Sequence, residues 1–280
     1  MRVLAPLGRR RVAVTGADDV GAYHVLRAAD PDGPQPWPGQ FYMLAAVQRW
    51  GAGEDERPYL PRAFSFLSAD DGRLSFMLED VGPGTRRLAE LVEGDELWIT
   101  GPLGTGFAAP TDSRRAILAG GGIGIPPLAA WATTLAQRGI DTTAVLGFRD
   151  AHHAAGARLL GRHGEAAGGG AGAAGSAVAI ATDDGSVGHH GLVTDLLAQE
   201  LDYDDHATIY SCGPPGMLEA VRALTVARGV PAQLALEAGM ACGFGACFGC
   251  VVAVRGGGYV RVCVDGPVLD AERLETVLAR

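Results

Sequence analysis

Four cysteines near the C-terminus, Cys242, Cys247, Cys250 and Cys263, are spaced C-x4-C-x2-C-x12-C. This is the ligand spacing of a plant-type [2Fe–2S] cluster, in which one tight loop supplies three thiolates and a later segment supplies the fourth. A zinc site usually shows two C-x2-C pairs, and here only one pair has that spacing. A disulfide pair is the other alternative. We therefore expect the last part of the chain to fold around an iron–sulfur cluster.

The glycines of this segment suit a cluster loop. Gly243, Gly245 and Gly249 let the backbone curl so that its N–H groups face the sulfur atoms. Such a cluster exchanges single electrons and performs no other chemistry. The chain must then contain, or dock against, both a source and a sink of electrons.

The composition indicates a globular protein. A chain of 280 residues should form two or three compact units, and 48% hydrophobic residues are enough for buried cores. The net charge of −9 and the pI near 5.2 argue against nucleic acid or an anionic membrane as the main partner. Five cysteines, four of them in the cluster pattern, fit a reducing cytoplasm rather than a disulfide framework.

One uncharged stretch has the length of a membrane span. Residues 116–137 carry no charge over 22 positions, but the sequence GGGIGIPP near their middle would break a lipid-exposed helix. A buried strand, a glycine turn and a helix explain this stretch better. The N-terminal sequence MRVLAPLGRRRVAV lacks the apolar core of a signal peptide. We expect a soluble, cytoplasmic protein.

The hydrophobic patterns divide the chain into three units. Residues 1–110 contain short alternating runs between Gly, Pro and Asp turns, which predict a small antiparallel β-barrel. A helix over 85–92 interrupts this barrel, with Leu88, Leu91 and Val92 on one face. Residues 111–232 alternate strands and helices, which is typical of a parallel α/β sheet, and residues 233–280 hold the cysteines. The predicted barrel strands are 11–15, 41–47, 74–78 and 96–100.

In the α/β unit, Gly- and Ala-rich residues 152–177 are expected to form a surface loop. Two of the helices open with Pro, which suits an early helical position. The predicted strands are 116–119, 143–148, 177–181 and 208–211, and the predicted helices are 126–137, 193–199 and 215–228.

Two motifs in the barrel half have residue types that bind a flavin nucleotide. Arg62-Ala63-Phe64-Ser65, expected to close a strand, offers a guanidinium for a diphosphate, a ring for stacking and a hydroxyl for a ring nitrogen. Gly82-Pro83-Gly84-Thr85 precedes the short helix and offers backbone N–H groups with a Thr cap. An ordinary strand end and a plain turn remain alternatives.

Three glycine motifs follow. Gly101-Pro102-Leu103-Gly104-Thr105-Gly106-Phe107 could approach a cofactor or simply join two domains. The segment 119–127, AGGGIGIPP, follows a buried strand and opens a helix, the context of a nucleotide diphosphate site, although it departs from the strict G-x-G-x-x-G pattern. Cys212-Gly213-Pro214-Pro215-Gly216-Met217 repeats that context, so Cys212 would lie beside the ligand unless it is a buried core cysteine.

These motifs, in this order, resemble the ferredoxin–NADP reductase superfamily. The C-terminal sequence LEAGMACGFGACFGC…YVRVCVDGPV is similar to that of the electron-transfer subunits of NAD-linked (class 1B) dihydroorotate dehydrogenases. The resemblance covers nearly the whole chain. It implies FAD on the barrel, NAD(H) on the α/β unit with its nicotinamide reaching the flavin near Cys212 and Gly213, and the [2Fe–2S] cluster between this FAD and the FMN of a separate catalytic subunit.

The resemblance also implies the site residues. The FAD-binding residues would be Arg62, Ala63, Phe64, Ser65, Met77, Leu78, Glu79, Gly84 and Thr85. The glycine turns would contribute Gly120, Gly121, Gly122, Gly124, Cys212 and Gly213 to nucleotide binding, and Cys242, Cys247, Cys250 and Cys263 would be the iron ligands.

Three features depart from the family pattern. Glu79 stands where the family often has Arg, so Arg86 is a candidate replacement for that contact. The usual E-R-M-A-C-G reads Glu237-Ala238-Gly239-Met240-Ala241-Cys242-Gly243, and the Gly/Ala loop is long.

Asp183 is a candidate ligand of a ribose hydroxyl and Arg149 of a 2′-phosphate, which leaves the choice between NAD and NADP open. His189 and His190 have no credible metal-binding arrangement.

We expect an electron-transfer subunit of pyrimidine biosynthesis. A flavin is needed because nicotinamide exchanges two electrons as hydride and the cluster one at a time, and no acid–base triad is required. The partner would be the FMN-containing catalytic subunit, in a heterotetramer of two copies of each. An NAD(P)H–ferredoxin or sulfide-linked oxidoreductase subunit of the same superfamily is one alternative. A non-catalytic iron–sulfur adaptor is another.

Overall fold

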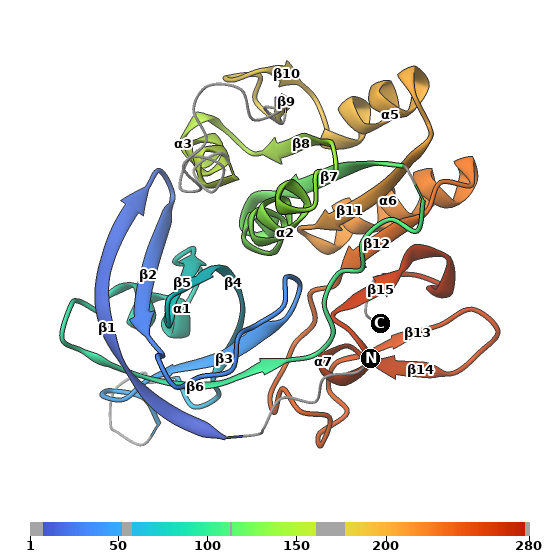
Figure 1. Cartoon of the computed structure of the whole chain (residues 1–280). Coiled ribbons are helices and arrows are strands. Elements are labelled where there is room, and N and C mark those ends of the chain that lie inside the picture. The colour runs from blue at the N-terminus through green and yellow to red at the C-terminus, as the bar shows by residue number, and fades with distance from the viewer. Residues whose placement is uncertain (1–7, 52–57, 113, 161–176, 278–280) are drawn as a thin grey trace.

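The computed structural model describes residues 8–51, 58–112, 114–160 and 177–277. Figure 1 shows three neighbouring parts: a blue and teal barrel, a green to orange sheet with its helices, and a red C-terminal part. The Gly/Ala-rich centre of the predicted loop, residues 161–176, lies outside the described residues. None of the helices within the described ranges is long and apolar enough to cross a membrane.

Six antiparallel strands close the predicted barrel in the order β1-β2-β5-β4-β3-β6. Alternating apolar side chains fill it, including Leu26, Leu44, Phe76 and Ile99, all buried. The strands are β1 (Arg9–Val20), β2 (Tyr23–Ala29), β3 (Phe41–Ala46), β4 (Arg62–Asp70), β5 (Arg73–Leu78) and β6 (Glu96–Leu103), with helix α1 (Pro83–Ala89) after β5.

Three details of the barrel differ from the sequence prediction. Arg62 begins β4 and does not close a strand, because Phe41 and Tyr42 pair with Ser65 and Phe64 and draw this segment into the sheet. Helix α1 ends at Ala89, and Val92 is 62% exposed rather than packed with Leu88 and Leu91. Strand β2 was not predicted either, because its sequence YHVLRAA does not alternate regularly between apolar and polar residues.

A seven-stranded sheet forms the second part, in the order β10-β9-β8-β7-β11-β12-β15. All neighbours are parallel except β12 and β15. Its strands are β7 (Arg115–Gly121), β8 (Thr142–Phe148), β9 (Ala177–Thr182), β10 (His189–His190), β11 (Ala207–Cys212), β12 (Ala232–Ala235) and β15 (Val268–Asp270). Its helices are α2 (Ile125–Gln137), α3 (Ala151–Ala154), α5 (Val193–Tyr203) and α6 (Pro215–Arg228). The uncharged stretch 116–137 is β7, a glycine turn and α2, as predicted.

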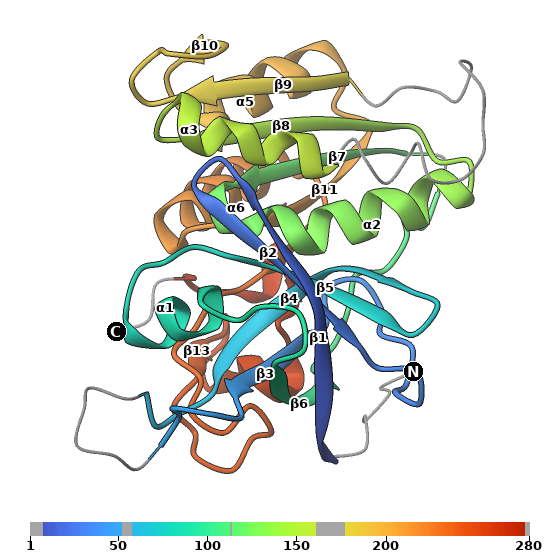
Figure 2. The same cartoon turned by 90° about the vertical axis from the view of Figure 1, so that its left-hand side faces the viewer.

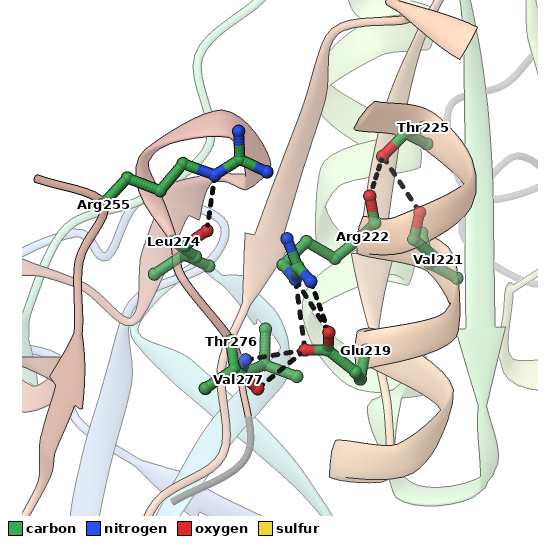
Figure 3. A network of polar contacts seen from close by, with 8 residues as sticks. All are labelled: Glu219, Val221, Arg222, Thr225, Arg255, Leu274, Thr276 and Val277. Carbon is green, nitrogen blue, oxygen red and sulfur yellow. Dashed lines mark hydrogen bonds and ion pairs between the residues drawn. The ribbon is translucent and has the colours of Figure 1, made fainter. Parts of the chain in front are cut away.

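The C-terminal part contributes a strand to the seven-stranded sheet. It contains the hairpin β13 (Val251–Ala253) and β14 (Tyr259–Arg261) and the short helix α7 (Val262–Asp265), after which β15 pairs with β12. The predicted boundary between residues 232 and 233 falls inside β12. Figure 3 shows how the end of the chain reaches α6: the Glu219 carboxylate accepts hydrogen bonds from Thr276 Oγ1 (3.0 Å) and Val277 N–H (2.9 Å).

The barrel and the sheet meet along α2, which packs against β4. A second contact lies at the turn between β1 and β2, which approaches α3 in both Figure 1 and Figure 2. There the Ala22 N–H donates to the His152 carbonyl (3.3 Å), and the ring of Tyr23 meets the ring of His153 edge-on at 5.8 Å. Residues of the barrel therefore contribute to the region where the strands β7 and β8 end.

Candidate functional site

A first cavity, of about 400 Å³, opens between the barrel, the end of β11 and the segment after β12. Arg62 lies across the start of α1, because a Cβ on Gly84 would be 2.6 Å from Arg62 Nε. The two predicted flavin motifs are thus brought together. The lining residues from the prediction are Arg62, Ala63, Phe64, Ser65, Met77, Glu79, Thr85 and Cys212.

Leu78 and Thr85 have roles that differ from the prediction. Leu78 is fully buried in the barrel core and does not line the cavity. Thr85 is not the cap of α1, since Gly82 holds that position; the Thr85 hydroxyl accepts hydrogen bonds from the N–H groups of Val81 and Gly82, both at 3.0 Å. This bond pattern holds the turn before α1 in shape.

A second cavity, of about 560 Å³, lies at the carboxyl ends of β7 and β8 and beside the start of α6. This is where open α/β sheets bind nucleotides. Gly121 and Gly122 of the predicted nucleotide turn line it, together with Phe148, Pro214 and Met217. Arg149 and Asp183, the two candidates for contacts with the ribose, also line it.

Four predicted glycines line neither cavity, and their small size serves close packing: Gly84 of the flavin motif, which lies against Arg62, and three glycines of the nucleotide turns. A Cβ on Gly120 would lie 2.9 Å from Leu128 Cδ1, one on Gly124 2.1 Å from the Cys212 carbonyl oxygen, and one on Gly213 2.8 Å from Met217 Cε. The motif 101–107 also lines neither cavity. Its Gly104 packs against Gly266 and Pro267, which agrees with the domain-joining alternative.

The two cavities meet. Glu79, Val81 and Ile123 line both of them, so a ring system in one cavity can approach a ring system in the other at this place. Arg86, the candidate replacement for the family's Arg, pairs instead with Asp80 at 3.3 Å.

Electrostatics at this junction were not foreseen from the sequence. Arg149 forms an ion pair with Glu79, and its Nη2 also donates to His153 Nε2 at 2.6 Å. His153 Nδ1 lies 2.7 Å from Asp150 Oδ1, and this hydrogen bond to His153 lowers the pKa of Asp150. Tyr23 and His153 could not be found from the sequence, because strand β2 was not predicted and the start of the loop expected over 152–177 is helical instead, with His153 on α3.

Glu237, like Tyr23 and His153, lines a cavity but was not predicted from the sequence to bind a cofactor. It lies on the segment after β12 and lines the first cavity, where it is open to water but surrounded by protein on most sides. Burial raises its pKa to about 7. The Cys212 thiol nearby has its pKa raised well above the ordinary value, first by burial and then by the charge of Glu237.

The four predicted cluster cysteines fall on one loop and on α7. The Cys263 N–H approaches Cys250 Sγ at 3.4 Å, and the Gly249 N–H approaches Cys247 Sγ at 3.5 Å. Burial opposes ionisation of Cys242, but hydrogen bonds from the Phe244 and Cys247 backbone outweigh it and lower its pKa to about 6. Burial and then the neighbouring Cys250 raise the pKa of Cys263 to about 12.

This donor set fits an iron–sulfur cluster. Neighbouring cysteines can all be thiolates only with a cation between them, and backbone N–H groups aimed at sulfur are the usual outer contacts of such clusters. Within the described ranges no three His, Cys, Asp or Glu side chains converge on a single metal ion. A [2Fe–2S] cluster does not require that, because its four ligands are shared between two irons.

The segment that leads into the cysteine loop lines the first cavity. Leu236, Glu237, Ala238, Gly239 and Met240 line that cavity, and Cys242 follows two residues later. Gly243 takes a φ of +77° and packs so closely on Met43 of β3 that a Cβ would lie 2.6 Å from Met43 Cγ. The cysteine loop, the first cavity and the second cavity are therefore consecutive neighbours in space.

Comparison with known proteins agrees with this arrangement. Residues 237–275 match the family model of the iron-sulfur cluster binding domain of dihydroorotate dehydrogenase B, and residues 118–223 match the oxidoreductase NAD-binding domain. Among solved structures, NADH-dependent reduced ferredoxin-NADP oxidoreductase superimposes with a TM-score of 0.78 at 23% identity, covering 96% of this chain and 91% of that one. The ferredoxin reductase of carbazole 1,9a-dioxygenase superimposes with a TM-score of 0.66 at 24% identity, covering 80% and 67%. These two likenesses establish the fold.

Sequence relatives are closer. The dihydroorotate dehydrogenase B (NAD(+)) electron transfer subunit of Geobacillus kaustophilus is 40% identical over 242 residues, which are 84% of this chain and 85% of the relative. The protein of the same name from Geobacillus thermodenitrificans is 38% identical over 275 residues, 95% of this chain and 98% of the relative. At such identity over most of both sequences, this chain belongs to the family of dihydroorotate dehydrogenase B electron transfer subunits.

Proposed function

We propose that this chain carries electrons between a catalytic dihydroorotate dehydrogenase subunit and NAD+, as part of pyrimidine biosynthesis. The observation that carries the proposal is a spatial order: the cysteine loop lies beside the first cavity, and the first cavity adjoins the second. FAD belongs in the first cavity, NAD(H) in the second, and [2Fe–2S] on the four cysteines. When bound, the flavin would link the one-electron chemistry of the cluster to the two-electron chemistry of nicotinamide.

The protein's own residues bind and orient these groups. Arg62 has the guanidinium geometry for a diphosphate, and Phe64 and Ser65 follow it on the same wall of the first cavity. The glycine turn Gly121–Gly122 opens towards α2 and offers N–H groups to the nucleotide phosphates. Apolar Val81 and Ile123 at the junction help to keep water away from the place where hydride passes.

The partner is proposed to be the FMN-containing catalytic subunit, in a complex of two copies of each chain. The cysteine loop presents exposed apolar side chains suited to such a contact, Phe244 at 47% and Phe248 at 61% exposure. The five free thiols fit the reducing cytoplasm, where we place the complex. The second cavity, which has the position of a nucleotide site, argues against a non-catalytic iron–sulfur adaptor.

Gly122→Asp tests the nucleotide assignment. Gly122 has a φ of +50°, and the one atom near an added Cβ is Tyr23 Oη at 3.8 Å, so Asp or Asn fits without a clash. A carboxylate there repels a diphosphate, and we expect NADH to bleach the flavin absorption at least about tenfold more slowly, while dithionite still reduces both centres.

Gly122→Asn is the matched control, since it has the same shape without the charge. We expect it to lose far less of the NADH reaction. Equal behaviour of the two variants, or full activity of Gly122→Asp, would contradict the assignment. Co-purification with a flavoprotein that oxidises dihydroorotate would identify the partner directly.

A further inference from the structure

An ion pair crosses from the barrel to the α/β sheet at the second cavity. Glu79 follows β5 of the barrel, and Arg149 follows β8 of the sheet. Besides the pair with Arg149, Glu79 Oε1 lies 3.5 Å from His153 Nε2. The Glu79 side chain is 22% exposed and the Arg149 side chain 64% exposed, so the carboxylate is the fixed partner and the guanidinium the movable one.

The charges around the cavity are few. Its described lining contains one guanidinium, Arg149, and two carboxylates, Glu79 and Asp183. The chain has no lysine, so a phosphate that enters here has no ammonium group to meet. His153 Nε2 accepts a hydrogen bond from Arg149, which leaves its Nδ1 to donate to Asp150.

The charge of the cavity lining affects the choice between the two nicotinamide dinucleotides. NADP carries a 2′-phosphate where NAD has a hydroxyl, and a phosphate monoester brings a charge of about −1.5 to −2 that arginine binds best. A 2′-hydroxyl can instead donate to a carboxylate such as that of Asp183. With Arg149 paired, the cavity presents net negative charge to the nucleotide.

We propose that Glu79, a residue of the flavin barrel, sets the preference of this cavity for NAD(H) over NADP(H) by engaging Arg149 across the domain boundary. The inference rests on the proposed function, because it assumes that the second cavity holds the dinucleotide. Removing the Glu79 charge frees the guanidinium to turn from the junction of the two cavities toward the adenosine half of the dinucleotide, while the amide of Gln keeps the shape of the wall.

The test measures binding of two nucleotide fragments to the purified holoprotein by calorimetry. The probes are ADP and 2′,5′-ADP, which differ only in the position of a phosphate that mimics the distinction between NAD and NADP. In Glu79→Gln we expect 2′,5′-ADP to bind about three- to tenfold more tightly at low salt, and the affinity for ADP to change much less. The ratio of NADPH to NADH oxidation should rise in the same direction.

A second variant identifies the group responsible. In Glu79→Gln/Arg149→Ala the gain should disappear, because the freed guanidinium is what binds the phosphate. Asp80→Asn is the matched control: Asp80 is the next residue, pairs with Arg86 and does not line the cavity, so the ratio of the two affinities should stay at the wild-type value.

Three results would overturn the inference. One is an unchanged ratio of affinities in Glu79→Gln, and another is an equal gain in the double variant. The third, failure of ADP to bind the wild-type protein, would also remove the proposed function. The first two would leave the NADH reaction and its loss in Gly122→Asp intact, which separates failure of this inference from failure of the function.

Discussion

At the scale of single residues, Glu237 shows how a cavity changes the chemistry of a side chain. No hydrogen bond or ion pair links its carboxylate to another described residue, and the titratable or charged side chains that share its cavity are Arg62, Glu79 and Cys212. Its pKa is raised to about 7 because protein surrounds most of the side chain, although one side stays open to water. Near neutral pH the protein therefore holds Glu237 close to the point at which it gains or loses a proton.

Glu237→Gln should change the pH dependence of stability. An acid whose pKa is higher in the folded state binds its proton more tightly there, so the free energy of unfolding falls as pH rises from the ordinary Glu value to about 7. We expect the variant to match the wild type near pH 5 and to be more stable near pH 8. Water in the cavity screens the charge, so the gain should be about 1 kcal/mol.

The midpoint of thermal unfolding at both pH values provides the measurement, with FAD content recorded alongside. Glu93→Gln, at an exposed loop position, is the control and should show no such pH dependence. A loss of stability in Glu237→Gln that is equal at both pH values would mean that the carboxylate makes a favourable contact in the folded protein.

Cavity-lining residues on short local motifs could be picked out from the sequence, and those brought in from elsewhere could not. Arg62 and Ser65, or Gly121 and Gly122, belong to patterns whose chemistry is readable within a few residues. Glu79 was flagged only as a departure, because its partner Arg149 is 70 positions away in the sequence. Pairings of that kind depend on how two domains pack, which periodicity and composition do not encode.

At the scale of elements, strands with clear alternation were predicted to within a few residues. Strand β2 was missed, and β4 was mistaken for the end of a strand, because barrel closure rather than local pattern decides which backbone segments pair. Three of the α/β helices were predicted more closely, although α3 was expected to be loop. Helix α6 has the predicted bounds, because Pro215 starts it and Gly229 ends it with a φ of +66°.

The cysteine loop depends on backbone conformations that only glycine adopts easily. Gly245 has a φ of +87°, and a Cβ there would lie 2.6 Å from Val264 Cγ2. Gly245→Ala should distort the loop at a cost of about 1–2 kcal/mol or more and lower the iron content, while FAD stays bound to the barrel. Iron and flavin analysis of the purified variant checks this.

Gly249→Ala is the matched control within the same loop. A Cβ there would be 3.6 Å from Cys247 Sγ, an ordinary contact, and the Gly249 N–H that approaches this sulfur is kept. We expect nearly normal iron content. If both variants kept their iron, the loop would be more adaptable than its backbone angles indicate.

At the scale of the whole molecule, the three parts are joined so that their sites adjoin. Strand β15 returns from the cysteine part to the edge of the sheet, and Glu219 fixes the end of the chain to α6, whose first residues line the second cavity. Both cavities lie between parts rather than inside one. The sequence predicted three units in the right order, but not that the last one completes the sheet of the second.

This arrangement predicts the order of electron transfer. If hydride enters at the second cavity, the flavin lies before the cluster, and Cys247→Ser should leave bleaching of the flavin by NADH nearly unchanged. The NADH-driven reduction of the partner subunit's flavin should fall to background, because the cluster is the step between them. Anaerobic absorption measurements on the complex distinguish the two flavins from the cluster.

Cys212→Ser, a change outside the cysteine loop, is the control for iron content and should keep its iron. Undiminished transfer to the partner in Cys247→Ser would show that electrons leave the first cavity by a route that does not use these four cysteines.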